Sequence, residues 1–158
     1  MVTIIIDNYI EVFAIKTFQK FFHQLLMLYR PFENKLNQLL AQHQLQRAQW
    51  TILYYISNFG SATLVELSHY QGVEKPTVTR TITRLEELGF VEQVPSKDRR
   101  EKRMQLTEVG HKVYSEVRLT IDEFEQRILK GFTEKEQLEA IRLMEGIRSN
   151  LMEQGETH

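Results

Sequence analysis

Residues 63–106 read TLVELSHYQGVEKPTVTRTITRLEELGFVEQVPSKDRREKRMQL, and this stretch carries the strongest structural signals in the chain. Thr63 and Glu66 have the spacing of a capping box, which predicts a short helix that begins after Thr63. A turn follows, and Pro76 suits the first turn of a second helix, which ends before Gly89. The first half of the stretch therefore predicts two short helices joined by a turn.

The second half of the stretch predicts two short strands, at residues 90–94 and 103–106. Between them lies the charged segment PSKDRREK, residues 95–102, which is expected to form the mobile tip of a β-hairpin. Two short helices joined by a turn and followed by a hairpin are typical of a winged helix-turn-helix.

The sequence on both sides of this stretch is mostly helical. Apolar residues recur at three- and four-residue intervals over residues 18–40, which predicts a long amphipathic helix. Pro31 lies within that pattern and is expected to kink the helix or to divide it in two. Further helices are predicted at residues 47–58, 107–130 and 133–152. The predicted fold class is mainly α with a small β-hairpin wing.

The helix predicted after Pro76 has two unlike faces. At 100° per residue, Val78, Ile82 and Leu85 fall on one side, where they are able to pack on the preceding helix. The opposite side is polar and carries Thr77, Arg80, Thr83 and Arg84, with Thr79 at its flank. Such a face suits the major groove of DNA, because threonine reaches phosphates or thymine methyls and arginine pairs with guanine. Lys75 at the start of the helix would meet a phosphate, whereas an ordinary solvated face is the alternative interpretation.

The loop at the predicted wing tip is rich in cations. It carries, within seven positions, Lys97, Arg99, Arg100, Lys102 and Arg103. A wing of this kind is able to place an arginine in the minor groove, where the negative potential is strongest at A·T tracts. Asp98 would repel phosphate, so it is interpreted either as a partner that orients an arginine or as a plain acidic turn residue. The candidate DNA contacts are thus Lys75, Thr77, Thr79, Arg80, Thr83, Arg84, Lys97, Asp98, Arg99, Arg100 and Arg103.

The charge is unevenly distributed along a chain of 158 residues with a formal net charge of −1. Residues 1–74 have five basic and five acidic side chains, residues 75–103 have eight and five, and residues 104–158 have seven and eleven. One basic island in a near-neutral chain indicates a local anionic partner.

Several classes of function are excluded by what the sequence lacks. The chain has no cysteine, which removes disulfides, thiolate metal sites and catalytic thiols. No cofactor or metal site is predicted, because no compact ligand spacing is formed by His23, His43, His69 and His111. The chain has no glycine-rich phosphate loop and no nucleophile elbow, so it is not predicted to be an enzyme. Without a membrane-length apolar run or a signal-peptide pattern, the expected location is the cytoplasm.

A series of short motifs resembles those of the MarR (multiple antibiotic resistance regulator) family of bacterial transcription factors. These motifs are QWTIL at residues 49–53, TLVEL at 63–67, VTR at 78–80, LEELGFV at 85–91, DRR at 98–100 and LTEVG at 106–110. The resemblance extends over about residues 20–150. Two features depart from it: Glu92 and Gln93 stand where the family often has an arginine, and residues 1–15 have no counterpart.

The resemblance implies a homodimer in which winged lobes project from a helical dimerisation domain. Residues 1–44 and 107–158 would form that domain, and residues 45–106 would form the winged helix-turn-helix domain. A two-fold dimer would read a pseudo-palindrome with recognition helices about one DNA turn apart. The last two helices carry apolar residues that are expected to pack against a partner chain; the alternative is that they pack in a three-helix bundle within one chain. These residues are Ile121, Phe124, Ile128, Leu129, Phe132, Leu138, Ile141, Leu143, Met144, Ile147 and Leu151.

The function expected from the sequence is that of a sequence-specific transcriptional regulator that binds double-stranded DNA as a homodimer. The resemblance further implies a ligand-responsive repressor, since relatives commonly bind small anionic aromatics, metals or peroxides, of which the cysteine-dependent peroxide response is excluded here. The aromatic residues of the first two helices, with Arg30, would suit such a pocket as well as they suit core packing, so no effector is named. The alternative is a winged-helix module that binds a protein and not DNA.

Overall fold

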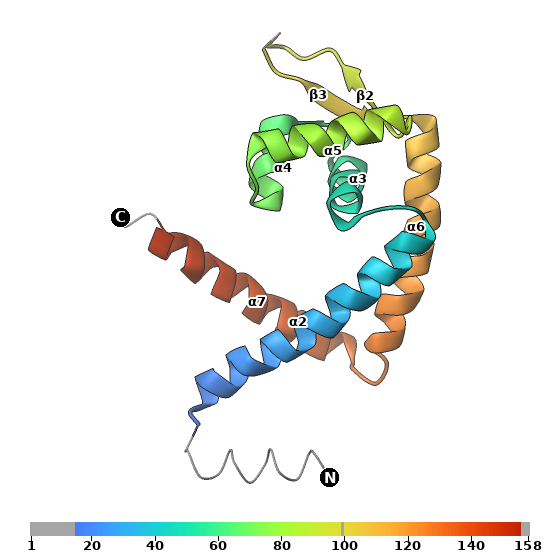
Figure 1. Ribbon diagram of the computed structural model, residues 1–158. Helices are drawn as coiled ribbons and strands as arrows, with labels where there is room; N and C mark the ends of the chain where they lie inside the picture. The colour runs from blue at the N-terminus through green and yellow to red at the C-terminus, as the bar shows by residue number, and fades with distance from the viewer. Residues whose placement is uncertain (1–14, 99, 156–158) are drawn as a thin grey trace. The chain divides into compact units, whose positions relative to one another are not determined.

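The computed structural model describes residues 15–98 and 100–155 (Figure 1). The chain divides into two compact units, Met1–Ile121 and Asp122–His158. Residues 1–15 have no expected counterpart in the family, and all of them except residue 15 lie outside the described residues. In the described parts of the chain, none of the helices has the length and apolar character needed to cross a membrane.

The predicted fold class is confirmed, and each predicted helix and strand is present with ends shifted by a few residues at most. In chain order the elements are α2 (Thr17–Gln42), α3 (Arg47–Phe59), β1 (Ala62–Thr63), α4 (Leu64–Gln71), α5 (Lys75–Glu87), β2 (Val91–Val94), β3 (Arg103–Leu106), α6 (Glu108–Ile128) and α7 (Glu134–Gly155). Figure 1 shows the hairpin of β2 and β3 projecting beyond α5, as expected of a wing.

Local capping determines where the short helices begin and end. The backbone N–H of Glu66 donates to the Thr63 hydroxyl at 3.2 Å, and the backbone N–H of Thr63 donates to the Glu66 carboxylate at 2.7 Å. This capping box confirms the predicted start of α4. The helix ends at Gly72, whose φ of 64° is a left-handed conformation that glycine adopts without strain.

Pro31 does not divide the first long helix. A single α-helix, α2, runs through this residue, so the expected division is wrong. Proline lacks the N–H that would bond to the carbonyl four residues earlier, at Met27. The Met27 side chain is exposed, and water therefore has access to that turn of the helix.

The wing belongs to a three-stranded antiparallel sheet in the order β1-β3-β2. The central strand pairs with β2 through Leu106 and Val91, and with β1 through Met104 and Ala62. Strand β1 is absent from the sequence prediction because two residues show no alternating pattern. Its existence depends on the partner strand, which supplies the hydrogen bonds.

The core of the first unit joins the helix-turn-helix, the sheet and the flanking helices. Ile52, Leu67, Ile82 and Met104 are fully buried in it, and each such side chain stabilises the fold by roughly 1.5–3 kcal/mol. Leu36 and Leu40 from α2, and Val117 and Ile121 from α6, belong to the same cluster. The core therefore takes residues from both segments that flank the expected DNA-binding segment 45–106.

Apolar side chains outside the core remain exposed on the long helices. Ile121 and Phe124, expected at a partner interface, are instead buried within the chain. The first half of α2 exposes Phe18, Phe21, Phe22, Leu25, Leu26, Met27, Leu28 and Tyr29. The second unit exposes Ile128, Leu129, Phe132, Leu138, Ile141, Leu143, Met144, Leu151 and Met152. Surfaces this apolar are characteristic of protein interfaces.

Candidate nucleic-acid interface

Helix α5 separates an apolar face from a polar face, as its sequence predicts. Val78, Ile82 and Leu85 are each 0 % exposed and pack in the core. The side chains on the other face are all exposed; they are Thr77, Thr79, Arg80, Thr83 and Arg84. Because the buried face anchors the helix, the exposed face presents its side chains on a rigid element.

The threonine hydroxyls of this face are partly engaged inside the helix. Thr79 donates its hydroxyl to the carbonyl oxygen of Lys75 at 2.9 Å, and Thr83 donates to that of Thr79 at 2.9 Å. Each oxygen keeps its capacity to accept a hydrogen bond, for example from an adenine or cytosine amino group. Donating to a phosphate would break the bond within the helix, whereas accepting from a base would not.

The two arginines of the face differ in their surroundings. The Arg84 Nη1 atom lies 2.9 Å from the Glu87 Oε2 atom, and both side chains are 58 % exposed. An exposed pair of this kind contributes about 0.2–1 kcal/mol, so a phosphate or base could replace the carboxylate. The Arg80 Nη2 atom has a hydrogen bond to the Thr77 hydroxyl at the long distance of 3.5 Å.

The N-terminal turn of α5 is open to solvent. Lys75, Pro76, Thr79 and Arg80 line one shallow depression there. A helix N-terminus attracts anions through its unpaired N–H groups and its dipole. The lysine and the arginine at this depression add positive charge to that attraction.

The tip of the wing is shaped by Asp98. Its carboxylate accepts a hydrogen bond from the backbone N–H of Arg100 at 2.9 Å, and its carbonyl oxygen accepts from the N–H of Glu101 at 3.0 Å. This is an Asx turn, in keeping with the interpretation of Asp98 as an acidic turn residue. Lys97 and Arg100 are exposed beside it, and Arg99 lies outside the described residues.

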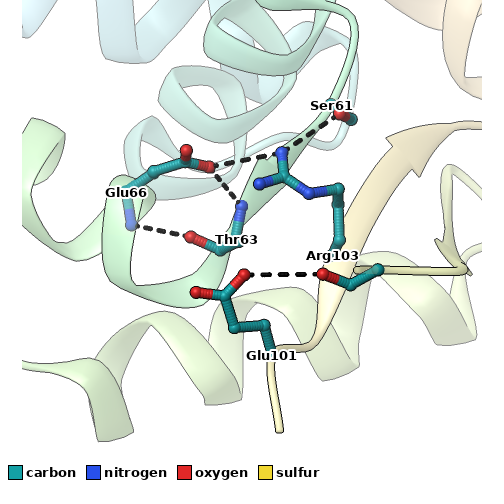
Figure 2. Close-up of polar contacts among 6 residues, drawn as sticks. Ser61, Thr63, Glu66, Glu101 and Arg103 are labelled. Atoms are coloured by element: carbon teal, nitrogen blue, oxygen red, sulfur yellow. Dashed lines mark hydrogen bonds and ion pairs between the residues drawn. The ribbon is translucent and has the colours of Figure 1, made fainter. Parts of the chain in front are cut away.

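At the base of the wing, two of the cations in the charged loop have carboxylate partners within the chain. Lys102 forms an ion pair of 2.8 Å with Glu86 of α5. Figure 2 shows the Arg103 guanidinium directed at Glu66 and Ser61; the ion pair measures 3.5 Å and the hydrogen bond to the Ser61 hydroxyl 3.3 Å. The interpretation of Arg103 as a DNA contact is thus in competition with contacts inside the chain, because β1 brings Ser61 beside β3.

The contacts of Glu66 lower the pKa of its carboxyl and so favour the charged form that faces Arg103. The backbone N–H of Thr63 lowers the pKa of the Glu66 carboxyl, although burial acts in the opposite direction. The Thr63 hydroxyl and the charge of Arg103 lower this pKa further. Sequence reasoning gave Glu66 no structural role beyond the helix cap and gave Ser61 and Glu86 no role at the wing, because no local pattern links these residues to it.

The sequence predicts no metal site because its histidines are far apart along the chain. His43, the C-cap residue that follows α2, is hydrogen-bonded through Nε2 to the Thr120 hydroxyl of α6 at 3.0 Å. Among residues 15–98 and 100–155, no three histidine, aspartate or glutamate side chains are grouped so that they could hold a metal ion.

Comparisons with known protein sequences identify regulators. Residues 43–101 match the sequence model of the MarR family. The chain is 38 % identical over 114 residues to the uncharacterized HTH-type transcriptional regulator YwoH of Bacillus subtilis, covering 72 % of this chain and 83 % of that protein. It is 32 % identical over 143 residues to an uncharacterized HTH-type transcriptional regulator of Staphylococcus aureus strain MSSA476, covering 89 % of this chain and 97 % of that protein. These relatives are regulators and not enzymes, as the sequence predicts for this chain.

Solved structures share the fold. Staphylococcus aureus MarR, in complex with salicylate and kanamycin, aligns with a TM-score of 0.76 and 30 % identity over 85 % of this chain and 92 % of that one. A cysteine-to-serine mutant of Escherichia coli MarR, complexed with operator DNA, aligns with a TM-score of 0.70 over 84 % of this chain and 99 % of that one. At 23 % identity the second likeness concerns the fold alone.

Proposed function

The chain belongs to the MarR family of helix-turn-helix transcriptional regulators, and we propose that it is a repressor that binds a pseudo-palindromic operator as a homodimer. The observation that carries the proposal is the exposed polar face of α5, whose opposite face is fully buried. The fold shared with the operator complex of Escherichia coli MarR supports the same role. Because DNA is the proposed ligand, the proposed place of action is the cytoplasm.

In this proposal α5 is the recognition helix and lies in the major groove. Arg80 and Arg84 pair with guanine edges, and the threonine oxygens accept from base amino groups. Lys75 contacts a phosphate near the helix N-terminus. The wing lies along the adjacent minor groove, where Lys97, Arg99 and Arg100 meet negative potential.

The wing-tip arginines are expected to contribute affinity without sequence preference. Arg100→Ala should weaken binding to cognate and scrambled DNA by the same factor, because a phosphate or minor-groove contact reads charge. The slope of log affinity against log salt should fall by about 0.9 for each phosphate contact removed. Fluorescence anisotropy titrations at several salt concentrations measure both quantities. Arg99→Ala is expected to behave alike; equal slopes for both variants and the wild type would exclude these contacts.

We propose that residues 1–44 and 107–158 form the dimerisation domain. The exposed apolar side chains of α2 and α7 are the reason, because water contact with them is unfavourable by about 25 cal/mol per Å². The segment 104–158 has seven basic and eleven acidic residues, so a dimerisation domain that includes it would repel phosphates. The dimer would thus direct its basic lobes at the DNA.

Repression is proposed to occur by steric occlusion of a promoter. A small-molecule effector would release the protein if it bound a conformer whose lobes are wrongly spaced for the operator. Salicylate and kanamycin are present in the Staphylococcus aureus MarR complex, which supports a small-molecule site of some kind in this chain. The chemistry of the effector is left open.

The experiment that tests the function is selection of bound fragments from a genomic DNA library with the full-length protein. A recovered pseudo-palindrome, bound by two chains per site with a steep salt dependence, is the expected result. The alternative winged-helix module for protein binding predicts that no sequence is enriched. It also predicts that charge reversal on α5 leaves partner affinity insensitive to salt.

A further inference from the structure

Two adjacent cations at the start of β3 are held by carboxylates on two different helices. The Lys102 Nζ atom lies 2.8 Å from Glu86 Oε2, and both side chains are about one-third exposed. The Arg103 Nη1 atom lies 3.5 Å from Glu66 Oε2; the Arg103 side chain is 29 % exposed and the Glu66 side chain 45 %. The Lys102–Glu86 pair is therefore the better shielded of the two, and a partly buried ion pair is screened less by solvent and salt than a pair on an open surface.

The carboxylates lie on the two helices of the helix-turn-helix. Glu86 is in the last turn of α5, and Glu66 is in the capping box that begins α4. Strand β3 is also joined to β1 by only two residue pairs, Ala62 with Met104 and Thr63 with Arg103. The side-chain contacts of Lys102 and Arg103 therefore supplement a short ladder at the point where the wing leaves the domain.

Other cations of the basic island differ from these two. Lys97 and Arg100 are exposed at the wing tip, and Arg84 pairs with Glu87 on the open surface of α5. A phosphate that approached Lys102 would have to compete with Glu86, a carboxylate already in contact with the ammonium group. The same holds for Arg103, which is bound to Ser61 as well as Glu66.

We propose that Lys102 and Arg103 are positioning residues, which hold the wing against α5 and α4, and are not phosphate contacts. Their effect on DNA binding is indirect. They keep the wing tip and the recognition helix in one relative orientation, so that the wing reaches the minor groove while α5 lies in the major groove. This inference rests on the proposed DNA-binding function. It assigns Glu86 and Glu66 a favourable part in DNA binding, although each carries the same sign of charge as the DNA.

The first test exchanges the charges of one pair. Lys102→Glu and Glu86→Lys should each weaken operator binding by about tenfold, and the double variant should recover most of that loss. Hydrogen exchange of the wing amides in free, full-length protein should rise in both single variants and return towards the wild-type rate in the double variant. A phosphate contact at Lys102 predicts no recovery and unchanged exchange, which would overturn the proposal.

The second test asks whether removing a carboxylate raises or lowers operator affinity. Glu86→Gln is expected to weaken operator binding severalfold with an unchanged salt slope. Glu87→Gln is the matched control, because it removes the same charge from the same turn of α5 without touching the wing. It should leave affinity unchanged or raise it. If Glu86→Gln raises affinity as Glu87→Gln does, Lys102 is a DNA contact and the proposal fails.

The Arg103 pair is tested by Glu66→Gln, which keeps the capping box because glutamine serves at the same position. Thermal unfolding should change little, whereas wing exchange should rise and operator affinity should fall. Arg103→Gln with Glu66→Gln should lose no more than the larger single loss, since both remove one interaction. Full additivity would overturn the pairing. If the wild type binds no DNA, the proposed function fails, while the exchange measurements still test the positioning role.

Discussion

Arg80→Ala is expected to reduce affinity for the operator by roughly 1–3 kcal/mol, a loss of about 5- to 150-fold. The residue lies on the exposed face of α5, and its weak contact at 3.5 Å with Thr77 offers little competition for the guanidinium. A bidentate contact with guanine would be lost together with its selectivity. Anisotropy titrations against the operator and against single-base variants of it measure both the loss and the relaxed preference.

The control for Arg80 separates shape from charge. Arg80→Lys keeps the charge but loses the planar pair of donors, so it should recover little of the specificity. Lys35→Ala removes one exposed cation from α2 and should leave operator affinity near that of the wild type. Wild-type affinity and base preference in Arg80→Ala would show that α5 does not read DNA through this residue.

Gly110→Ala is expected to destabilise the first unit by about 3 kcal/mol or more. A Cβ atom at this position of α6 would collide with the backbone carbonyl oxygen of Phe90, just before β2. That oxygen also accepts a hydrogen bond from the N–H of Thr107 at 3.1 Å, so the backbone there is held on both sides. The wing and α6 would have to separate to make room. Urea unfolding followed by circular dichroism measures the loss.

Gly146→Ala is the matched control for Gly110→Ala. Both glycines lie in helices, but a Cβ atom at Gly146 would meet nothing within 4 Å beyond its chain neighbours and the nearby backbone of its own helix. Alanine there should stabilise α7 by about 0.5–1 kcal/mol, because it reduces the freedom of the unfolded chain. Equal unfolding midpoints for the two variants would contradict the close approach of α6 to Phe90.

Local patterns predicted most of the fold and the main surface of the candidate site. The start of α4 followed from Thr63 and Glu66, and the two faces of α5 followed from Val78, Ile82 and Leu85. These features depend on residues three or four positions apart, which the geometry of a helix brings together in any context. A sequence is sufficient for such inferences. The DNA contacts assigned to the exposed face remain proposals.

Tertiary structure alone decided the features that join distant residues. Strand β1 exists because Ala62 and Thr63 meet β3, and α2 continues through Pro31 as one helix. The sequence assigned Arg103 to the DNA, but the fold places its guanidinium beside Glu66 and Ser61. Charge and residue type determine what a side chain is able to bind. Which partner it meets depends on the packing of segments tens of residues apart, because an ion pair requires contact in space and not proximity along the chain.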